Sequence, residues 1–411
     1  MIAQLEKPSA KPPGLRRVWA DFGVTYAANG FIGWLFAVTA PVAIVLSVGS
    51  RGGLSEAEIA SWVFGVFFFN GLITIGFSWL YRQPLVYFWT IPGTVLVGPA
   101  LAHLSFAEVV GAFYLTGLLM FVLSITGWVK STMAAVPMPI VMGMVAGVFL
   151  RFGLDLVQAL HADLGIAGPM VVAWLVLSAV PTLGRRMPPL IGALLVGVGA
   201  ALLDGRFDSA TFATLEIIEP VIQAPAWSLA AAIELVVPLA ITVLVVQNGQ
   251  GIAVLRAVDH QPPVNAITAA CGIGAMISAA FGGVSTCLTG PTNAIVSSSG
   301  KRERHYTAGI FVGLLALVFG LLAPTFTRFL LDAPEAFVMT LAGLAMLKIL
   351  QAAFTTCFRD KFTLGALIAF LVTVADLALF NIGAAFWGLV AGILVSRLLE
   401  RQDFADAVRE D

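Results

Sequence analysis

Two short segments interrupt apolar stretches of the chain in the same way. They are residues 90–94, with sequence TIPGT, and residues 289–293, with sequence TGPTN; each follows a β-prone run, 86–90 and 284–289 respectively. Proline fits the first position of a helix, where its missing N–H costs nothing. The pattern therefore predicts, twice, a short strand followed by a half-helix that begins inside a membrane segment.

The composition indicates the environment of these breaks. Of the 411 residues, 59% are hydrophobic and 11% are charged, and the mean hydropathy is +0.96. This is too little polar surface to cover a soluble protein of this size. Apolar windows near the roughly 20 residues of a spanning helix recur from about residue 29 onward, so the first is a span rather than a cleaved signal peptide. We expect an all-α integral membrane protein without a separate soluble domain.

The apolar segments form two repeats. Fourteen are predicted, with approximate centres at residues 40, 68, 92, 118, 146, 175, 196, 238, 272, 290, 317, 344, 370 and 389. Pro41 and Pro137 of the first half correspond to Pro238 and Pro334 of the second at one common offset. Because seven is odd, the second repeat enters the membrane from the opposite side, which makes an inverted repeat. The broken third and tenth segments then face each other near the midplane.

The distribution of basic residues supports an even number of crossings. If the amino terminus is cytoplasmic, 17 of the 22 lysines and arginines fall on the inside. The positive-inside rule then predicts a multi-pass membrane protein with both termini in the cytoplasm. Two basic residues lie within spans. We expect Arg151 to pair with Asp155 one turn away, and Lys348 to extend from near a span end towards a membrane surface.

The two half-helix starts predict an anion site. Their free amide donors are expected at Gly93, Thr94 and Val95 in one break and at Thr292, Asn293 and Ala294 in the other. Each start carries about half a positive charge, so two of them converging at low dielectric can bind an anion without a basic side chain. Neither broken segment contains Lys or Arg, which suits one monovalent anion such as a carboxylate.

Structural explanations of the same residues remain open. A Pro-Gly break can be a simple helix kink. Thr90 and Thr289 can bond to carbonyl groups of their own helix instead of a ligand. Gln247, Asn248 and Gln250 cluster at the end of an apolar run in the eighth segment, beside the tenth. Such amides either hold helices together or contact a ligand.

Other candidate residues complete the predicted site. Tyr87 and Trp89 flank the first break and Phe36 lies in the first span, where they can form walls for an apolar ring. Glu234, about 9 Å into the eighth span, is the best acidic candidate for proton coupling. The three cysteines have neither disulfide nor metal-site spacing. Walker, catalytic-triad and zinc motifs are absent from the sequence, and the charges form no basic face, so an enzyme, a primary pump and a nucleic-acid binder are disfavoured.

Four stretches carry a resemblance to a known family. They are residues 35–41 (LFAVTAP), 88–94 (FWTIPGT), 137–144 (PMPIVMGM) and 281–293. Together they resemble the BenE family of benzoate/proton symporters over nearly the whole chain. The wider fold is similar to that of uracil and sulfate permeases. This resemblance implies a seven-plus-seven inverted repeat in which a core domain moves against a gate domain.

The resemblance also implies domain boundaries. The core domain would comprise residues 29–132 and 226–330, and the gate domain residues 133–205 and 333–399. Residues 1–28 and 400–411 would be cytoplasmic. The substrate would bind between the third and tenth spans, with the eighth contributing.

One departure from the uracil permeases concerns the substrate. Those relatives have glutamates on the eighth and tenth spans, where this chain has Gln247 and Pro291. Carboxylates suit the N–H groups of a nucleobase but repel a carboxylate substrate. The replacement therefore favours an organic anion, and it leaves the proton carrier unassigned.

The predicted function is secondary active import of benzoate or a related aromatic carboxylate with protons, by an elevator-like mechanism without a cofactor. The predicted substrate contacts are Phe36, Tyr87, Trp89, Thr90, Gly93, Thr94, Gln247, Gln250, Thr289, Gly290, Thr292 and Asn293. The alternatives are a uracil- or xanthine-type nucleobase permease and an anion channel on the same fold. A non-transporting scaffold is disfavoured because paired broken helices are costly without a ligand. Expected partners are the organic anion, protons and the lipid bilayer, and assembly as a homodimer is left open.

Overall fold

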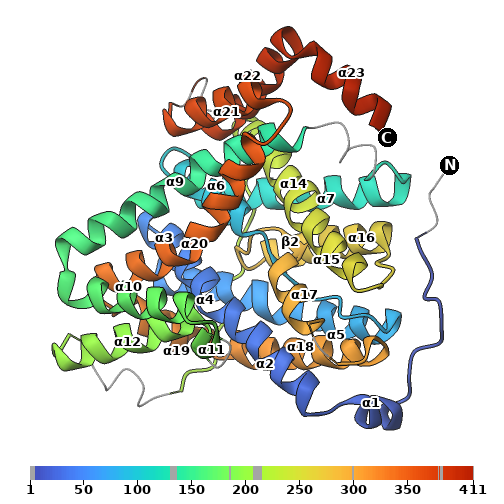
Figure 1. Ribbon diagram of the computed structural model, residues 1–411, viewed down its shortest axis with the longest axis vertical. Helices are drawn as coiled ribbons and strands as arrows, with labels where there is room; N and C mark the ends of the chain where they lie inside the picture. Colours follow the sequence, from blue (N-terminus) through green and yellow to red (C-terminus); the bar gives the residue numbers. More distant parts are fainter. Residues whose placement is uncertain are drawn as a thin grey trace.

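The protein is mostly helical (Figure 1). The computed structural model describes residues 5–129, 137–184, 187–206, 215–298, 300–377, 379 and 383–410. Within these residues, seven helical stretches are long and apolar enough to cross a membrane, and six shorter apolar helices accompany them. The predicted class, a helical membrane protein, agrees with this inventory.

One set of helices surrounds the two broken segments, and we call it the strand-bearing set. Its members are α2 (Val24–Val38), α3 (Ala40–Arg51), α4 (Glu56–Phe64), η1 (Gly65–Phe69), α5 (Asn70–Tyr81), β1 (Tyr87–Trp89), α6 (Ile91–Ala100), α7 (Phe106–Thr126), α13 (Leu229–Ala231), η3 (Ala232–Val236), α14 (Val237–Ile241), η4 (Thr242–Asn248), α15 (Gly249–Ala257), α16 (Val264–Ala279), β2 (Thr286–Leu288), α17 (Gly290–Val296), η5 (Arg302–Arg304) and α18 (His305–Leu321). In this set α16 packs on α7, α18 packs on α5 and α2, and α17 packs on α2 and α15.

The second set lies beside the first, and we call it the flanking set (Figure 1). It consists of α9 (Met138–Ala162), α10 (Leu164–Ala179), α11 (Pro181–Gly184), α12 (Pro189–Leu203), α20 (Glu335–Cys357), α21 (Thr363–Val374) and α22 (Ala384–Leu399). Here α20 packs along α9, α21 packs on α9 and α22, and α10 packs on α12. The two sets meet where α3 contacts α20, α6 contacts α9, and η3 and α14 contact α22. The remaining helices are α1 (Leu15–Asp21), α19 (Ala323–Leu331) and α23 (Arg401–Glu410).

The two broken segments lie side by side as an antiparallel strand pair. Tyr87 is opposite Leu288, and Trp89 is opposite Thr286. The pairing continues at both ends, because the Thr90 N–H donates to the Ser285 carbonyl at 3.0 Å and the Thr289 N–H donates to the carbonyl of Val86 at 3.1 Å. Backbone that is not helical is tolerated in a membrane only where its polar groups find partners. The predicted strand and half-helix are therefore confirmed in both segments, and each strand is the partner of the other.

Buried side chains satisfy the outer edges of this strand pair. The Asn248 Oδ1 accepts a hydrogen bond from the Leu288 N–H at 2.7 Å. The Thr74 hydroxyl accepts one from the Tyr87 N–H at 2.8 Å. Since unpaired buried backbone groups are costly, these contacts hold the strands in place. The hydrogen bond from Leu288 gives Asn248 a structural role.

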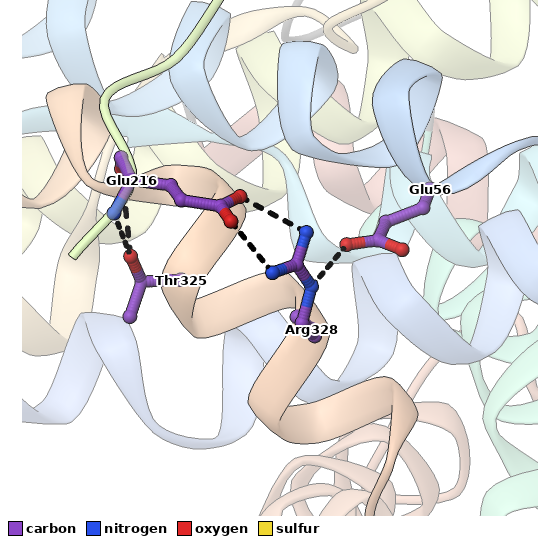
Figure 2. Close-up of polar contacts among 4 residues, drawn as sticks. All are labelled: Glu56, Glu216, Thr325 and Arg328. Atoms are coloured by element: carbon purple, nitrogen blue, oxygen red, sulfur yellow. Dashed lines mark hydrogen bonds and ion pairs between the residues drawn. The ribbon is translucent and has the colours of Figure 1, made fainter. Parts of the chain in front are cut away.

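The segment that joins the flanking helix α12 to α13 is fastened to the strand-bearing set. Figure 2 shows the Arg328 guanidinium of α19 donating to both oxygens of Glu216, at 2.7 and 2.9 Å, and to Glu56 at 3.2 Å. The Thr325 hydroxyl accepts from the Glu216 N–H at 2.9 Å. Further along, the Ala226 N–H donates to the Ala107 carbonyl at 2.8 Å. From residue 216 to residue 226 the connecting segment is therefore held by contacts with α19, α7 and neighbouring helices.

Candidate functional site

A cavity of about 560 Å³ lies between the two sets of helices, at the broken segments. The strand-bearing set contributes most of its wall, from α2, α3, both breaks and the junction of η4 with α15. The flanking set closes the other side with residues of α9 and α20, namely Met138, Met142, Lys348, Ile349, Ala352 and Thr356. The volume is in the range typical of small-molecule sites.

Half of the predicted substrate contacts line this cavity. They are Phe36, Trp89, Gln247, Gln250, Thr289 and Thr292. Phe88 also lines it, although the sequence analysis did not single it out. The lining thus combines aromatic rings with amides and hydroxyls, which is the combination that an aromatic molecule with a polar head group needs.

The two glutamines reach the cavity from a locally widened helix. Gln247 lies at the end of η4, whose hydrogen bonding is that of a π-helix, and such turns are frequent at functional sites. Gln250 follows in α15 and its amide lies against Gly290, so closely that a Cβ at position 290 would collide with it. Gly290 therefore contributes space for Gln250 rather than a contact of its own.

The other predicted contacts lie outside the cavity lining. They are Tyr87, Thr90, Gly93, Thr94, Gly290 and Asn293. Tyr87 is fully buried and packs against Phe77, with ring centroids 5.4 Å apart. The Asn293 side chain binds backbone: its Oδ1 accepts from the Val86 N–H at 3.1 Å, and its Nδ2 donates to the carbonyls of Val86 and Thr289 at 3.0 and 2.6 Å.

The amide N–H groups at the start of the first half-helix already have hydrogen-bond partners within the same segment. The Thr90 hydroxyl accepts from the Gly93 N–H at 3.1 Å, and the Thr94 N–H donates to the Thr90 carbonyl at 2.9 Å. The prediction that these two amides are free is therefore wrong. The cause is an N-cap, the commonest arrangement for a threonine at this position.

The start of the second half-helix differs. Thr289 makes no capping hydrogen bond through its side chain, and its hydroxyl instead faces the Val86 carbonyl at 3.5 Å. Pro291 and Thr292 at this start line the cavity. The positive end of α17 is thus the one that remains without a side-chain cap next to the cavity.

A lysine completes the cavity. Lys348 is the only charged side chain among the described lining residues, and it is the fourteenth of the 23 residues of α20. Lys348 was expected near the end of its span and lies well within it instead. The cavity at the broken segments, where no fixed cation was expected, contains one. The available signal was a single lysine in an otherwise apolar helix, which by default marks a functional site.

Glu234 lies in a second cavity, of about 660 Å³, which borders the carboxyl-terminal half of α6. It is 5% exposed, and its carboxylate is 2.8 Å from the Nε2 of His103. The same carboxylate lies against Gly383, which precedes the flanking helix α22. His103 lies in the turn between α6 and α7, and no local pattern in the sequence indicates its pairing with Glu234.

A cross-set ion pair lies near the second cavity. The Arg51 guanidinium, at the end of α3, is 2.9 Å from the carboxylate of Asp155 in α9. Asp155 therefore pairs across the two sets. The expectation that it pairs with Arg151 of its own helix is wrong. Helical spacing places Arg151 within reach, but only the packing of α3 beside α9 brings Arg51 to the same carboxylate.

Comparison with known proteins identifies relatives along the whole chain. The family model described as "BenE: Benzoate membrane transport protein" matches residues 20–398. The inner membrane protein YdcO of Escherichia coli (strain K12) is 28% identical over 367 residues, 88% of this chain and 93% of that protein. A benzoate membrane transport protein of Acinetobacter baylyi is 26% identical over 392 residues, 94% of this chain and 98% of that protein.

Solved structures show the same fold. The transmembrane domain of the cyanobacterial bicarbonate transporter BicA aligns with a TM-score of 0.61 at 16% identity, covering 93% of this chain and 99% of that one. The murine Solute Carrier 26 family member A9 anion transporter, in its inward-facing state, aligns with a TM-score of 0.63 at 13% identity, covering 96% and 73%. At such identities the likeness concerns the arrangement of the helices and not the site.

Proposed function

The chain belongs to the BenE family of benzoate membrane transport proteins, and we propose that it is a secondary active transporter importing benzoate or a related aromatic carboxylate across the bacterial inner membrane. The relatives are named as membrane proteins and transport proteins, in line with the prediction of a transporter rather than an enzyme. The observation that carries the proposal is the first cavity, because its lining combines aromatic rings with amide and hydroxyl groups at the two broken segments.

The substrate would lie across this cavity. Its ring would pack against Phe36, Phe88 and Trp89, and its carboxylate would point towards Gln247, Gln250 and Thr292. The neutral amide of Gln247 supports this direction, since a glutamate there would repel an anion. A volume of about 560 Å³ also leaves room for water beside a molecule the size of benzoate.

The transport mechanism would be elevator-like. We assign residues 29–132 and 226–330, which contain the strand-bearing set except for the start of α2, to a moving core domain. Residues 133–205 and 333–399 would form a gate domain, in a fourteen-segment inverted repeat. The support is that the two breaks bind one another and their own set, whereas the cavities lie between the sets. With both termini in the cytoplasm, the first cavity faces inward and the second outward.

Proton coupling would use Glu234 and His103. The two groups are 2.8 Å apart and can share a proton, and the carboxylate touches the start of gate helix α22. The charged residues that line the same cavity, Arg51, Arg151 and Asp376, would also influence this titration. A change of protonation at this pair would therefore alter a contact between the two domains.

Uptake by the purified protein in liposomes tests the proposal. We expect saturable benzoate uptake that an inward proton gradient accelerates, with competition by aromatic carboxylates and none by uracil. Competition by uracil in place of benzoate would indicate a nucleobase permease. A current that rises linearly with driving force, without saturation, would indicate an anion channel.

A further inference from the structure

Lys348 occupies a depth that a lysine rarely has. It is nine residues from the last residue of α20, about 13 Å at 1.5 Å per residue. It lines the first cavity together with Ala352 and Thr356, one and two turns further along the same helix face. Its side chain is exposed. The lysine therefore faces the cavity from deep inside a span rather than extending from the span's end.

The charge of Lys348 has no counter-charge in the part of the chain that the structure describes. Its cavity contains no described carboxylate, and no described acidic residue lies within ion-pair distance of it. The lining of the second cavity, in contrast, includes the carboxylates Glu234 and Asp376 beside its basic groups. An uncompensated ammonium group at membrane depth is costly. Its presence is accounted for if an anion arrives to neutralise it.

We infer that Lys348 is the counter-charge for the substrate carboxylate and the residue that selects carboxylates over neutral aromatic molecules. This inference rests on the proposed function, and it makes Lys348 the residue that binds the negative charge of the substrate. The amides of Gln247 and Gln250 are neutral and can bond to a carboxylate or to a carboxamide. The full positive charge of an ammonium group favours the carboxylate over the carboxamide, which the neutral amides do not.

This assignment has a consequence for transport. The aromatic walls and the glutamines belong to the strand-bearing set, whereas Lys348 belongs to the flanking set. One bound anion would therefore contact both sets and cancel the net charge of the cavity. Closing the two sets around a neutral complex costs less than closing them around a lone cation. Occupancy would thus favour movement of the loaded protein over that of the empty one.

The experiment compares benzoate with benzamide, its neutral isostere, by calorimetry on the purified full-length protein. The variants are Lys348→Gln, Lys348→Arg and, as a control with the same charge change, Lys301→Gln, since Lys301 lies outside the cavity lining. We expect Lys348→Gln to weaken benzoate binding at least about tenfold and benzamide binding less than about twofold. Lys348→Arg should keep most of the preference, and Lys301→Gln should match the unaltered protein.

A charge-rescue variant separates a local charge effect from a folding defect. Adding Ala352→Lys to Lys348→Gln returns a cation to the same face of α20, one turn away, and should recover part of the preference for benzoate. An unchanged benzoate-to-benzamide ratio in Lys348→Gln overturns the inference while leaving the proposed function intact. If the unaltered protein binds some other organic anion and not benzoate, the proposed substrate falls, and the ratio of that anion to its amide tests Lys348. Binding of no organic anion refutes both.

Discussion

The two broken segments share one plan and differ in the first turn of the half-helix that follows each strand. In the first, Thr90 caps α6 by accepting the Gly93 N–H, and Thr242 supports that hydroxyl at 3.1 Å. In the second, Thr289 leaves the start of α17 without a side-chain cap. Both starts reach the cavity, through Ile91 and Pro92 in the first break and through Pro291 and Thr292 in the second. The comparison therefore indicates that the two related segments differ in the side-chain cap, which only the first one has.

The fourth residue after each threonine provides the strongest test of this difference. Thr94 donates its hydroxyl to the Thr90 carbonyl within its own turn, whereas Asn293 binds both backbone groups of Val86 in the other break. We expect Asn293→Leu to cost about 2 kcal/mol, because it leaves the buried N–H of Val86 unpaired, whereas the Val86 carbonyl still accepts the Thr289 N–H. Thr94→Val should cost less than about 1 kcal/mol. Melting temperatures of the two purified variants check this, and equal losses would mean that the breaks are tied together symmetrically.

A charge placed beside the second break tests its role in substrate binding. Gln247 is buried and lines the cavity, so Gln247→Glu should reduce benzoate uptake at least about tenfold through repulsion. Gln247→Met, which has no charge, should have the smaller effect. Initial uptake rates in liposomes measure both. Undiminished uptake by the glutamate variant would place the carboxylate elsewhere.

The two threonines provide a test of intermediate size. Loss of an N-cap costs about 1 kcal/mol, so Thr90→Ala should lower the free energy of unfolding by about that amount. Thr289→Ala removes no cap and should cost less than about 0.5 kcal/mol. Thermal unfolding of both variants in the same detergent decides the matter, and a larger loss for Thr289→Ala would reverse the assignment of roles.

The smallest effect concerns the pH at which such comparisons are made. Burial, together with the nearby His305 and Arg302, lowers the pKa of His260 to about 4, in the loop between α15 and α16. The unfolded chain then binds a proton that the folded chain refuses between about pH 6.5 and 4. Stability present above pH 6.5 is lost as the pH falls through this window.

A His260→Asn variant should show a shallower decline of melting temperature between pH 6.5 and 4. Variants of the two broken segments are therefore best compared at pH 7 or above. An identical pH profile in the asparagine variant would show that other groups cause the acid sensitivity.

Some features were determined by the sequence alone because they depend on local chemistry. Apolar runs of spanning length, the two proline-started half-helices and the strands before them follow from residues that are neighbours in the chain. The family resemblance follows from the same stretches, and it was confirmed by the match over residues 20–398. Half of the candidate contacts, among them Trp89 and Gln247, also proved to line the cavity.

Only the tertiary structure decided how the remaining polar groups are used. Asn293 binds the backbone of Val86, and Asp155 pairs with Arg51 although Arg151 is one turn away. Lys348 faces the cavity that was expected to hold no cation. The physical reason is that a side chain at a break or within a span takes the partner that packing brings to it, and these partners come from segments far away in the sequence. A local pattern specifies where the backbone must break, but the packed helices determine which polar groups are left for a ligand.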